Sequence, residues 1–256
     1  MNAITYTPQP RQILAHGVAA KQILYGGAAG GGKSRWLRWD MVRFCLANEG
    51  LDAYLFRRTN PELEKNHIRR LKLELREAGI PYDYNHDQKR FVFPNGSGIN
   101  CCYCENEDDV LRYQGAEMHY LGIDEAAQMT EFQLTYLRSR VRLGSFVPAL
   151  GYAKALPRIA LTSNPGGPGH NFLKDTFVSP APREMVFIDK TTSVERIGYP
   201  GHTTIFIPAT MADNKYLEAE YEGQFTAMEP EARGRMTQLL RRLLRDSAET
   251  ESAGSM

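Results

Sequence analysis

Apolar positions along this chain fall into two patterns. Short continuous apolar runs predict buried strands, whereas apolar residues three and four positions apart predict helices. The predicted strands cover residues 22–26, 53–56, 90–93, 99–103, 118–123, 157–161, 185–188 and 204–208. An Asn-Gly turn between the third and fourth of these predicts an antiparallel hairpin added to the sheet. Strands that alternate with helices predict an α/β fold with a mainly parallel sheet flanked by helices.

Three helices are predicted between these strands. The first has an apolar face formed by Trp36, Leu37, Met41, Phe44 and Cys45. The second opens with Asn60 as its cap and Pro61 at its first position, and Gly79 closes it. The third opens in a capping box at Thr130, and its apolar face consists of Leu134, Leu137 and Val141.

Length and charge limit the range of protein classes. With 256 residues, the chain can form one α/β domain with a small appendage. We expect a core over residues 1–210, a small helical lid over 211–246 and a disordered tail over 247–256. The formal net charge is +1, so bulk electrostatics do not indicate a nucleic-acid partner, and any basic surface must be local.

The cysteines do not form a metal-binding pattern. Their positions are Cys45, Cys101, Cys102 and Cys104, with no matching second pair of cysteine or histidine, so buried reduced thiols in a cytosolic protein are the better interpretation. On a strand, Cys102 and Cys104 share a face and Cys101 lies on the other. The N-terminus lacks the basic start and apolar core of a signal peptide, and no apolar run is long enough to span a membrane.

A glycine-rich segment between the first strand and the first helix is the strongest chemical signal. It fits the phosphate-loop pattern of a glycine, four free positions and then Gly-Lys-Ser. The alternative is a chance glycine-rich turn, but the strand and helix on either side favour nucleotide binding. Backbone N–H groups there can surround a phosphate at the positive end of the helix dipole. The predicted nucleotide-binding residues are Gly27, Ala28, Ala29, Gly30, Gly31, Gly32, Lys33 and Ser34.

Individual side chains near this segment suggest further roles. We expect Lys33 to reach the β- and γ-phosphates of ATP and the Ser34 hydroxyl to ligate Mg²⁺. Gln12 is a candidate adenine reader, because its amide can both donate and accept a hydrogen bond; the alternative is a solvated helix start. Arg57 and Arg58 end the second strand, where one of them could sense phosphate, although surface charge is the default interpretation.

Two adjacent carboxylates follow the strand at 118–123. Asp124 is expected to hold Mg²⁺ through its water shell, and Glu125 to orient and activate the attacking water. Two solvated acids at a strand end are the alternative, disfavoured by the phosphate loop. Side chains alternate on a strand, so the two carboxylates can share one site only if the strand ends between them. The Asn164 amide follows the strand at 157–161. It can form a hydrogen bond with the attacking water or the γ-phosphate and transmit the presence of that group to the loop behind it.

Three arginines follow the carboxylates on the third predicted helix. Arg138 and Arg142 border its apolar stripe, whereas Arg140 projects away from it. If the protein forms a ring, Arg140 is the best placed of the three to reach a neighbour's γ-phosphate as an arginine finger. The alternative for each is a solvated surface charge.

Taken together, these motifs resemble the ATPase domain of tailed-bacteriophage large terminases. The resemblance rests on the loop 27–34, the Ile123-Asp124-Glu125 strand end and the Ser163-Asn164-Pro165 turn, and it extends over most of the chain. It implies that Gln12 contacts adenine and that Asp124 and Glu125 are the Walker B pair. It also implies that Asn164 belongs to the motif that couples hydrolysis to movement. One arginine acts in trans in some members, and Arg138, Arg140 and Arg142 are the candidates here.

The resemblance also implies partners and a biological role. Such proteins form homo-oligomeric rings, usually of five chains, that dock on the viral portal protein in the host cytoplasm. There they pump double-stranded DNA into a procapsid, and a small terminase subunit selects the DNA. The family normally continues into an RNase H-like nuclease, whereas this sequence stops before one, so we expect an ATPase without nuclease activity. Two alternatives stay open, a helicase-like DNA translocase and a nucleotide-gated assembly protein that does not hydrolyse ATP.

Overall fold

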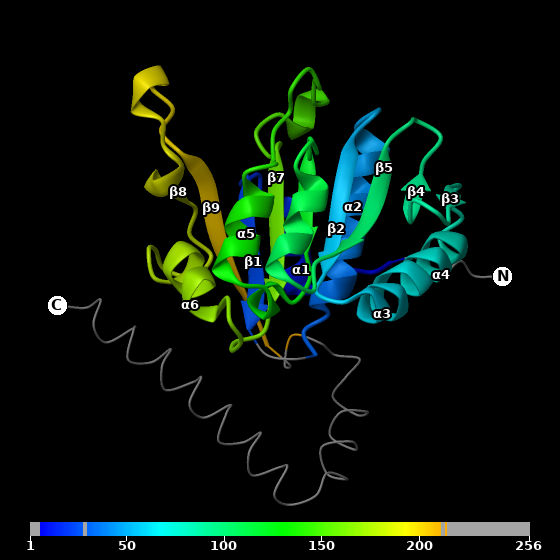
Figure 1. Ribbon diagram of the computed structural model, residues 1–256, viewed down its shortest axis with the longest axis horizontal. Coiled ribbons are helices and arrows are strands. Elements are labelled where there is room, and N and C mark those ends of the chain that lie inside the picture. The colour runs from blue at the N-terminus through cyan, green and yellow to red at the C-terminus, as the bar shows by residue number, and fades with distance from the viewer. Residues whose placement is uncertain (1–5, 28–29, 211–212, 214–256) are drawn as a thin grey trace, which may run out of the picture. The chain divides into compact units, whose positions relative to one another are not determined.

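A mixed β-sheet forms the centre of the computed structural model, which describes residues 6–27, 30–210 and 213 (Figure 1). Among these residues the sheet has nine strands in the order β3-β4-β5-β2-β6-β7-β1-β9-β8. From β5 to β9 in this order neighbouring strands are parallel, while β3 and β4 at one edge and β8 at the other run antiparallel to their neighbours. The strands are β1 Gln22–Gly27, β2 Asp52–Arg57, β3 Asp83–Asn85, β4 Arg90–Val92, β5 Gly98–Tyr103, β6 Tyr120–Ile123, β7 Arg158–Ser163, β8 Phe187–Asp189 and β9 His202–Ala209.

Helices cover both faces of this sheet. The α-helices are α1 Pro10–Gly17, α2 Lys33–Ala47, α3 Asn60–Leu63, α4 Arg69–Glu77, α5 Glu131–Arg138 and α6 His170–Leu173. Two π-helical turns follow α3 and α6, over Glu64–Ile68 and Lys174–Val178. Short 3-10 helices cover Glu107–Tyr113, Ala126–Gln128, Leu150–Tyr152, Lys190–Thr192 and Glu195–Ile197. None of the helices in the described ranges has the length and apolar character needed to cross a membrane.

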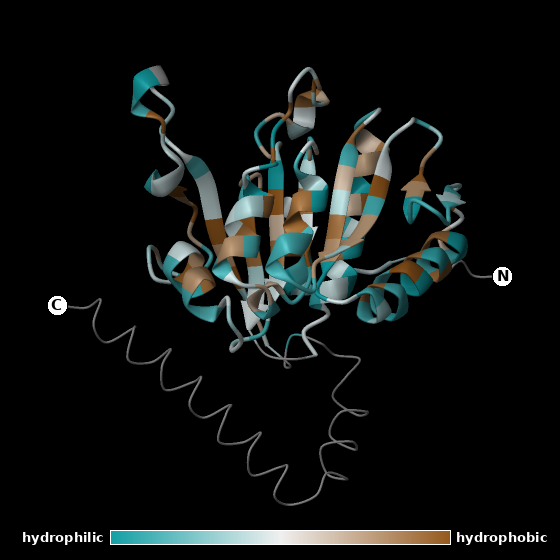
Figure 2. Ribbon diagram, in the orientation of Figure 1, coloured by the Kyte–Doolittle hydropathy of each residue, from teal (hydrophilic) through white to brown (hydrophobic). Residues whose placement is uncertain are grey.

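Strand side chains alternate between two apolar clusters, one on each face of the sheet. Ile23 and Tyr25 of β1 pack in one cluster with residues of α1, α2 and α4, whereas Leu24 packs in the other with residues of α5 and α6. Figure 2 shows apolar residues gathered along the central strands. The cysteines follow the same rule, because Cys101 lies in the first cluster and Cys102 in the second. The predicted α/β fold with buried thiols is therefore confirmed.

The predicted strands are all present, with small shifts in their ends. The hairpin around Asn95 is confirmed as the antiparallel pair β4 and β5. The edge strand β3 was not predicted, because its three residues are exposed or half-buried and give no apolar run. Strand β7 continues to Ser163, two residues further than the apolar run indicates. Apart from residue 213, the predicted helical lid and disordered tail lie outside the described residues.

The third predicted helix is shorter than its apolar pattern indicates. It ends at Arg138, so the prediction that it continues through Val141 is wrong. Val141 forms a parallel bridge with Met118, and the backbone of Met118 exchanges hydrogen bonds with Arg140 and Arg142. The backbone after Ser139 is therefore used for strand-like pairing, and Arg140 and Arg142 do not stand on a helix.

The second predicted helix is divided into three parts. Thr59, not Asn60, is its cap, since the Thr59 side chain accepts from the N–H of Glu62. A π-helical turn over Glu64–Ile68 separates α3 from α4, which the regular spacing of Leu71 and Leu75 does not predict. The hydrogen bond of a π turn joins residues five apart, one more than in an α-helix, so the turn changes the direction of side chains before it relative to those after it.

A buried ion pair joins α2 to β7. Asp40 and Arg158 are each 0% exposed, with 3.0 Å between Asp40 Oδ2 and Arg158 Nε. Tyr120 donates to Asp40 Oδ2 at 2.7 Å, and His16 lies 2.8 Å from Oδ1. Burial by itself would raise the pKa of Asp40, but the charge of Arg158 and the His16 hydrogen bond hold this pKa well below its usual range. The carboxylate therefore stays ionised inside the protein.

We expect Asp40→Asn to lower the free energy of unfolding by about 3–5 kcal/mol, because the substitution leaves the Arg158 charge buried without its partner. Urea titration at neutral pH measures this loss. Asp87→Asn, at an exposed site, is the control and should change stability by about 0.5 kcal/mol or less. Since folding lowers the pKa of Asp40, wild-type stability should also fall below about pH 4, where the unfolded carboxylate takes up a proton. Equal stability of the two variants would contradict the prediction.

Candidate functional site

The glycine-rich segment connects β1 to α2, as its flanking patterns predict. Gly27 ends β1 with φ at +136°, and a Cβ built there would lie 2.3 Å from the carbonyl oxygen of Ala209 on β9. Gly32 precedes the first residue of α2 with φ at +68°, in the left-handed region. Both positions therefore require glycine for conformational reasons. Ala28 and Ala29 lie outside the described residues.

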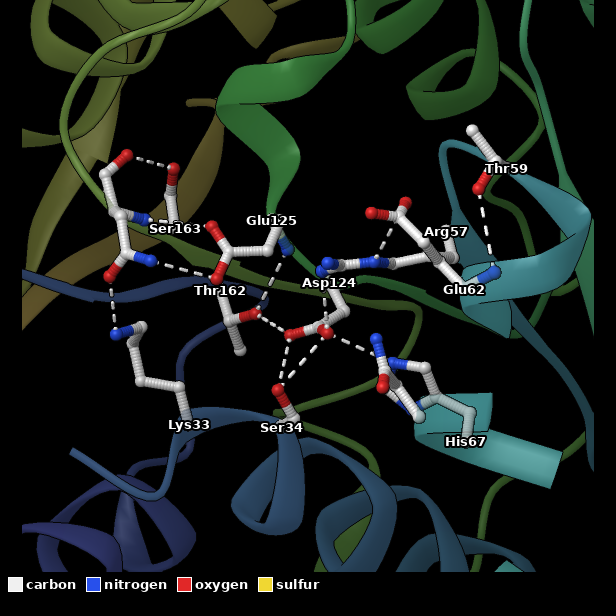
Figure 3. A network of polar contacts seen from close by, with 12 residues as sticks. Lys33, Ser34, Arg57, Thr59, Glu62, His67, Asp124, Glu125, Thr162 and Ser163 are labelled. Atoms are coloured by element: carbon white, nitrogen blue, oxygen red, sulfur yellow. Dashed lines mark hydrogen bonds and ion pairs between the residues drawn. The ribbon is translucent and has the colours of Figure 1, made fainter. Parts of the chain in front are cut away.

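Ser34 and Asp124 are brought together at the carboxyl edge of the sheet (Figure 3). The Ser34 hydroxyl, at the start of α2, lies 3.0 Å from each carboxylate oxygen of Asp124, the first residue after β6. Strands β6, β7 and β1 are adjacent and parallel, so the segments after them meet at one edge. The sequence prediction that these two residues share a site agrees with this geometry.

Asp124 is held by donors from four different segments. Besides Ser34, the donors are Arg57 Nη1 and His67 Nε2, each 2.9 Å from Oδ2, and the Thr162 hydroxyl, which donates to Oδ1. Asp124 is 2% exposed. Burial acts to raise its pKa, but His67 and then Arg57 outweigh this and hold the pKa of Asp124 below its usual range. The carboxylate is therefore ionised, and both of its oxygens accept hydrogen bonds.

Two of these donors were missed from the sequence, and one was misjudged. Arg57 is buried and directed at Asp124, so the default interpretation as surface charge is wrong, whereas Arg58 is exposed. His67 had one usable signal, because it precedes Leu71 by four residues and so continues the helical spacing of the apolar residues Leu71 and Leu75. Thr162 gave no such signal, since a threonine in a buried strand is an ordinary occurrence.

Glu125 points away from Asp124 and toward β7. Strand β6 ends at Ile123, and Glu125 adopts a left-handed conformation with φ at +53°. Its Oε1 accepts from Asn164 Nδ2 at 2.9 Å, and its Oε2 accepts from the Asn164 backbone N–H at 3.3 Å. Burial raises the pKa of Glu125, and the neighbouring Asp124 charge raises it further. The strand end thus directs the two carboxylates to different partners, as two separate roles require.

Asn164 joins Glu125 to the phosphate loop. Its Oδ1 accepts from Lys33 Nζ at 2.7 Å, while its Nδ2 donates to Glu125. Lys33 is 6% exposed, and this burial lowers its pKa against the opposing effect of Glu125 and Asp124. One amide therefore links the lysine expected to bind phosphate with the carboxylate expected to activate water.

Gln12 lies beside the last glycine of the phosphate loop. Its Nε2 donates to the Gly32 carbonyl at 2.9 Å, and its Oε1 accepts from the backbone N–H of Gln9 and from the Tyr6 hydroxyl. The side chain is 2% exposed. The amide thus anchors α1 to the phosphate loop, and its reading of adenine remains a prediction.

The three candidate finger arginines lie near the amino ends of the central strands, opposite to the phosphate loop. Arg138 donates to Gln22 at 2.7 Å, and Gln22 is the first residue of β1, whereas the phosphate loop follows its last. Arg140 and Arg142 pair through their backbones with Met118, just before β6. None of the three can therefore reach the phosphate loop of its own chain, and a role in catalysis requires a neighbouring chain.

Together, the strand-loop-helix, the carboxylate pair after β6 and the mainly parallel sheet define the P-loop NTPase fold class. Within this class the chain belongs to the terminase large subunits, since the family model described as terminase large subunit, T4likevirus-type, N-terminal matches residues 24–248. A search of curated proteins found no match.

Solved structures of phage terminases have the same fold. The large terminase of a thermophilic bacteriophage superposes with a TM-score of 0.61 at 17% identity, over 88% of this chain and 52% of that one. The complex of that terminase with ATP-gamma-S gives a TM-score of 0.60 at 16% identity, over 87% of this chain and 50% of that one. The ATPase domain of the Thermus phage P74-26 large terminase gives a TM-score of 0.57 at 16% identity, over 89% of this chain and 90% of that one. The chain thus spans about half the length of the thermophilic bacteriophage terminase.

Proposed function

We propose that this chain is the ATP-hydrolysing motor of viral double-stranded DNA packaging, which couples hydrolysis to DNA translocation into a procapsid. The observation that carries the proposal is the meeting of Lys33, Ser34, Asp124, Glu125 and Asn164 at one edge of the sheet. Membership of the terminase family supports the DNA-packaging role. The complexes of the thermophilic bacteriophage terminase with ATP-gamma-S and ADP support an adenine nucleotide as the ligand.

The site fits an ATP-bound Mg²⁺. Ser34 and Asp124 present a hydroxyl and a carboxylate 3.0 Å apart, and hard oxygen donors of this kind suit Mg²⁺. When bound, the ion would offset charge on the phosphates. Lys33 would add a positive charge at the β- and γ-phosphates, and the loop N–H groups would fix their position. Glu125, the carboxylate that Asn164 orients, would accept a proton from the attacking water.

The proposed partners follow from the family. We expect a homo-oligomeric ring, with five chains as the working number, docked on the portal protein in the host cytoplasm and supplied with DNA by a small terminase subunit. Arg140 and Arg142 are the better finger candidates, because Arg138 is 13% exposed in its side chain and bound to Asp189 within the chain. The absence of nuclease activity remains a prediction, and incubating the chain with plasmid DNA and Mg²⁺ tests it.

Steady-state ATP hydrolysis measured against protein concentration, with and without double-stranded DNA, tests the motor. We expect activity per chain to rise with concentration and with DNA, and Arg140→Ala or Arg142→Ala to abolish the rise. Activity that is flat with concentration in all variants would contradict the ring. A requirement for single strands would indicate a helicase-like translocase instead. Negligible turnover at saturating ATP and DNA would indicate a nucleotide-gated assembly protein.

A further inference from the structure

The contact between His67 and Asp124 is not explained by packing. His67 is 0% exposed, and its Nε2 must donate to Asp124, because an ionised carboxylate accepts hydrogen bonds only. Its Nδ1 is buried and has no hydrogen-bond partner among the described residues. A buried nitrogen without a hydrogen bond lowers the stability of the fold, and an apolar side chain would fill this position without that cost. The favourable polar contact of the His67 ring is therefore its hydrogen bond to Asp124, the carboxylate expected to hold Mg²⁺.

The backbone around His67 is also unusual. His67 belongs to the π-helical turn Glu64–Ile68, closed by a hydrogen bond from the Arg69 N–H to the Glu64 carbonyl. A π turn is rare in helices and often occurs at functional sites. Here it interrupts a segment that begins and ends as ordinary α-helix. The irregular backbone therefore includes His67, the residue that contacts Asp124.

The π turn is fixed to the helix that follows the phosphate loop. Arg38 on α2 donates from Nη1 to the Asn66 carbonyl at 2.9 Å and from Nε to Glu74 on α4, also at 2.9 Å. Arg38 is 5% exposed. The same helix begins with Lys33 and Ser34. The π turn and the helix that carries the Ser34 hydroxyl are therefore held together, and His67 connects Asp124 to this π turn.

We infer that His67 is a positioning residue that holds Asp124 toward Ser34, so that the Mg²⁺ complex of the nucleotide binds more tightly than the nucleotide without the ion. The inference rests on the proposed ATPase function. His67 would not touch the ion, because Asp124 would stand between them. Outer-shell partners of this kind orient the groups that hold a metal, and their loss costs about 10-fold to 100-fold in metal affinity.

The test is the ratio of two dissociation constants for ADP, one in excess EDTA and one in excess MgCl₂. We expect His67→Asn and His67→Leu to lower this ratio about 10-fold or more, while ADP affinity in EDTA stays at the wild-type value. His67→Gln should retain most of the ratio, because its amide nitrogen reaches the place of Nε2. The amide of Asn is one bond shorter and does not reach it. The Asn and Gln variants are alike in chemistry, so they keep the comparison valid if the Leu variant fails to fold.

His119→Leu is the matched control. His119 is also a buried histidine, 8% exposed. It lies at the amino end of β6, away from the candidate site, and accepts from the Asp52 N–H. This variant should leave the ratio unchanged. An unchanged ratio in His67→Asn, or an equal loss of ADP affinity with and without Mg²⁺, would overturn the inference and leave the proposed function standing. A wild-type chain that binds no nucleotide would overturn both.

Discussion

Glu125→Gln is expected to keep ATP binding at the wild-type level and to slow hydrolysis by about 10²-fold to 10⁴-fold, the range that a general base contributes. The amide of Gln has the size of the carboxylate and can still accept from Asn164 Nδ2. It cannot take a proton from water. Single-turnover hydrolysis measures the chemical step, and equilibrium binding of ATP measures the affinity separately.

Glu131→Gln is the control, since Glu131 is exposed in the first turn of α5, close in sequence. It should hydrolyse ATP at the wild-type rate. Unchanged turnover in Glu125→Gln would refute the assignment of the base. A parallel loss of ATP affinity would instead indicate that Glu125 helps to shape the phosphate site.

Asp124 is a poorer candidate for the base than its neighbour. Its pKa lies below the usual range, because His67 and Arg57 stabilise the ionised form against the effect of burial, and both of them are hydrogen-bonded to Oδ2. Glu125 has a raised pKa, caused first by burial and then by the charge of Asp124. A higher pKa makes a carboxylate a stronger proton acceptor. The two adjacent acids are therefore separated by their surroundings into a fixed anion and a base.

The parts of this site that lie within one segment were predictable from sequence. The phosphate loop combines a glycine pattern with its own strand and helix, so Lys33 and Ser34 are placed by local structure. Asp124 and Asn164 follow apolar strands, and parallel strands bring their carboxyl ends to one edge. Local pattern and sheet geometry together therefore determine which residues meet.

The contacts that do not follow from the order of the strands were not predictable. His67 is 57 residues from Asp124, and its direction depends on a π turn that spacing does not reveal. The end of α5 depends on pairing between Met118 and Val141, which overrides an apolar spacing that would continue the helix. The side chain at the end of that helix, Arg138, contacts Gln22, a residue 116 positions away. In each case a distant partner decides the outcome.

Lys33→Met is expected to weaken ATP binding and to lower the hydrolysis rate by about 10²-fold to 10³-fold, the cost of removing one preorganised donor from a site of developing charge. Methionine keeps the unbranched stem of the buried lysine, so packing around it is retained. The ammonium is lost, however, and with it the donor to Asn164 Oδ1. Binding of ATP by calorimetry and single-turnover hydrolysis measure the two effects.

Lys21→Met is the control, because Lys21 lies at the amino end of β1, whereas the phosphate loop follows the carboxyl end of this strand. It should bind and hydrolyse ATP as the wild type does, and wild-type behaviour of Lys33→Met would refute the prediction.

Asn164 adds a further consequence, since it touches both Lys33 and Glu125. In a double-mutant cycle, Lys33→Met and Asn164→Ala should therefore slow hydrolysis less together than the product of their separate effects. Multiplying effects would mean that the lysine and the amide act independently, and that the link from phosphate to base runs through other atoms.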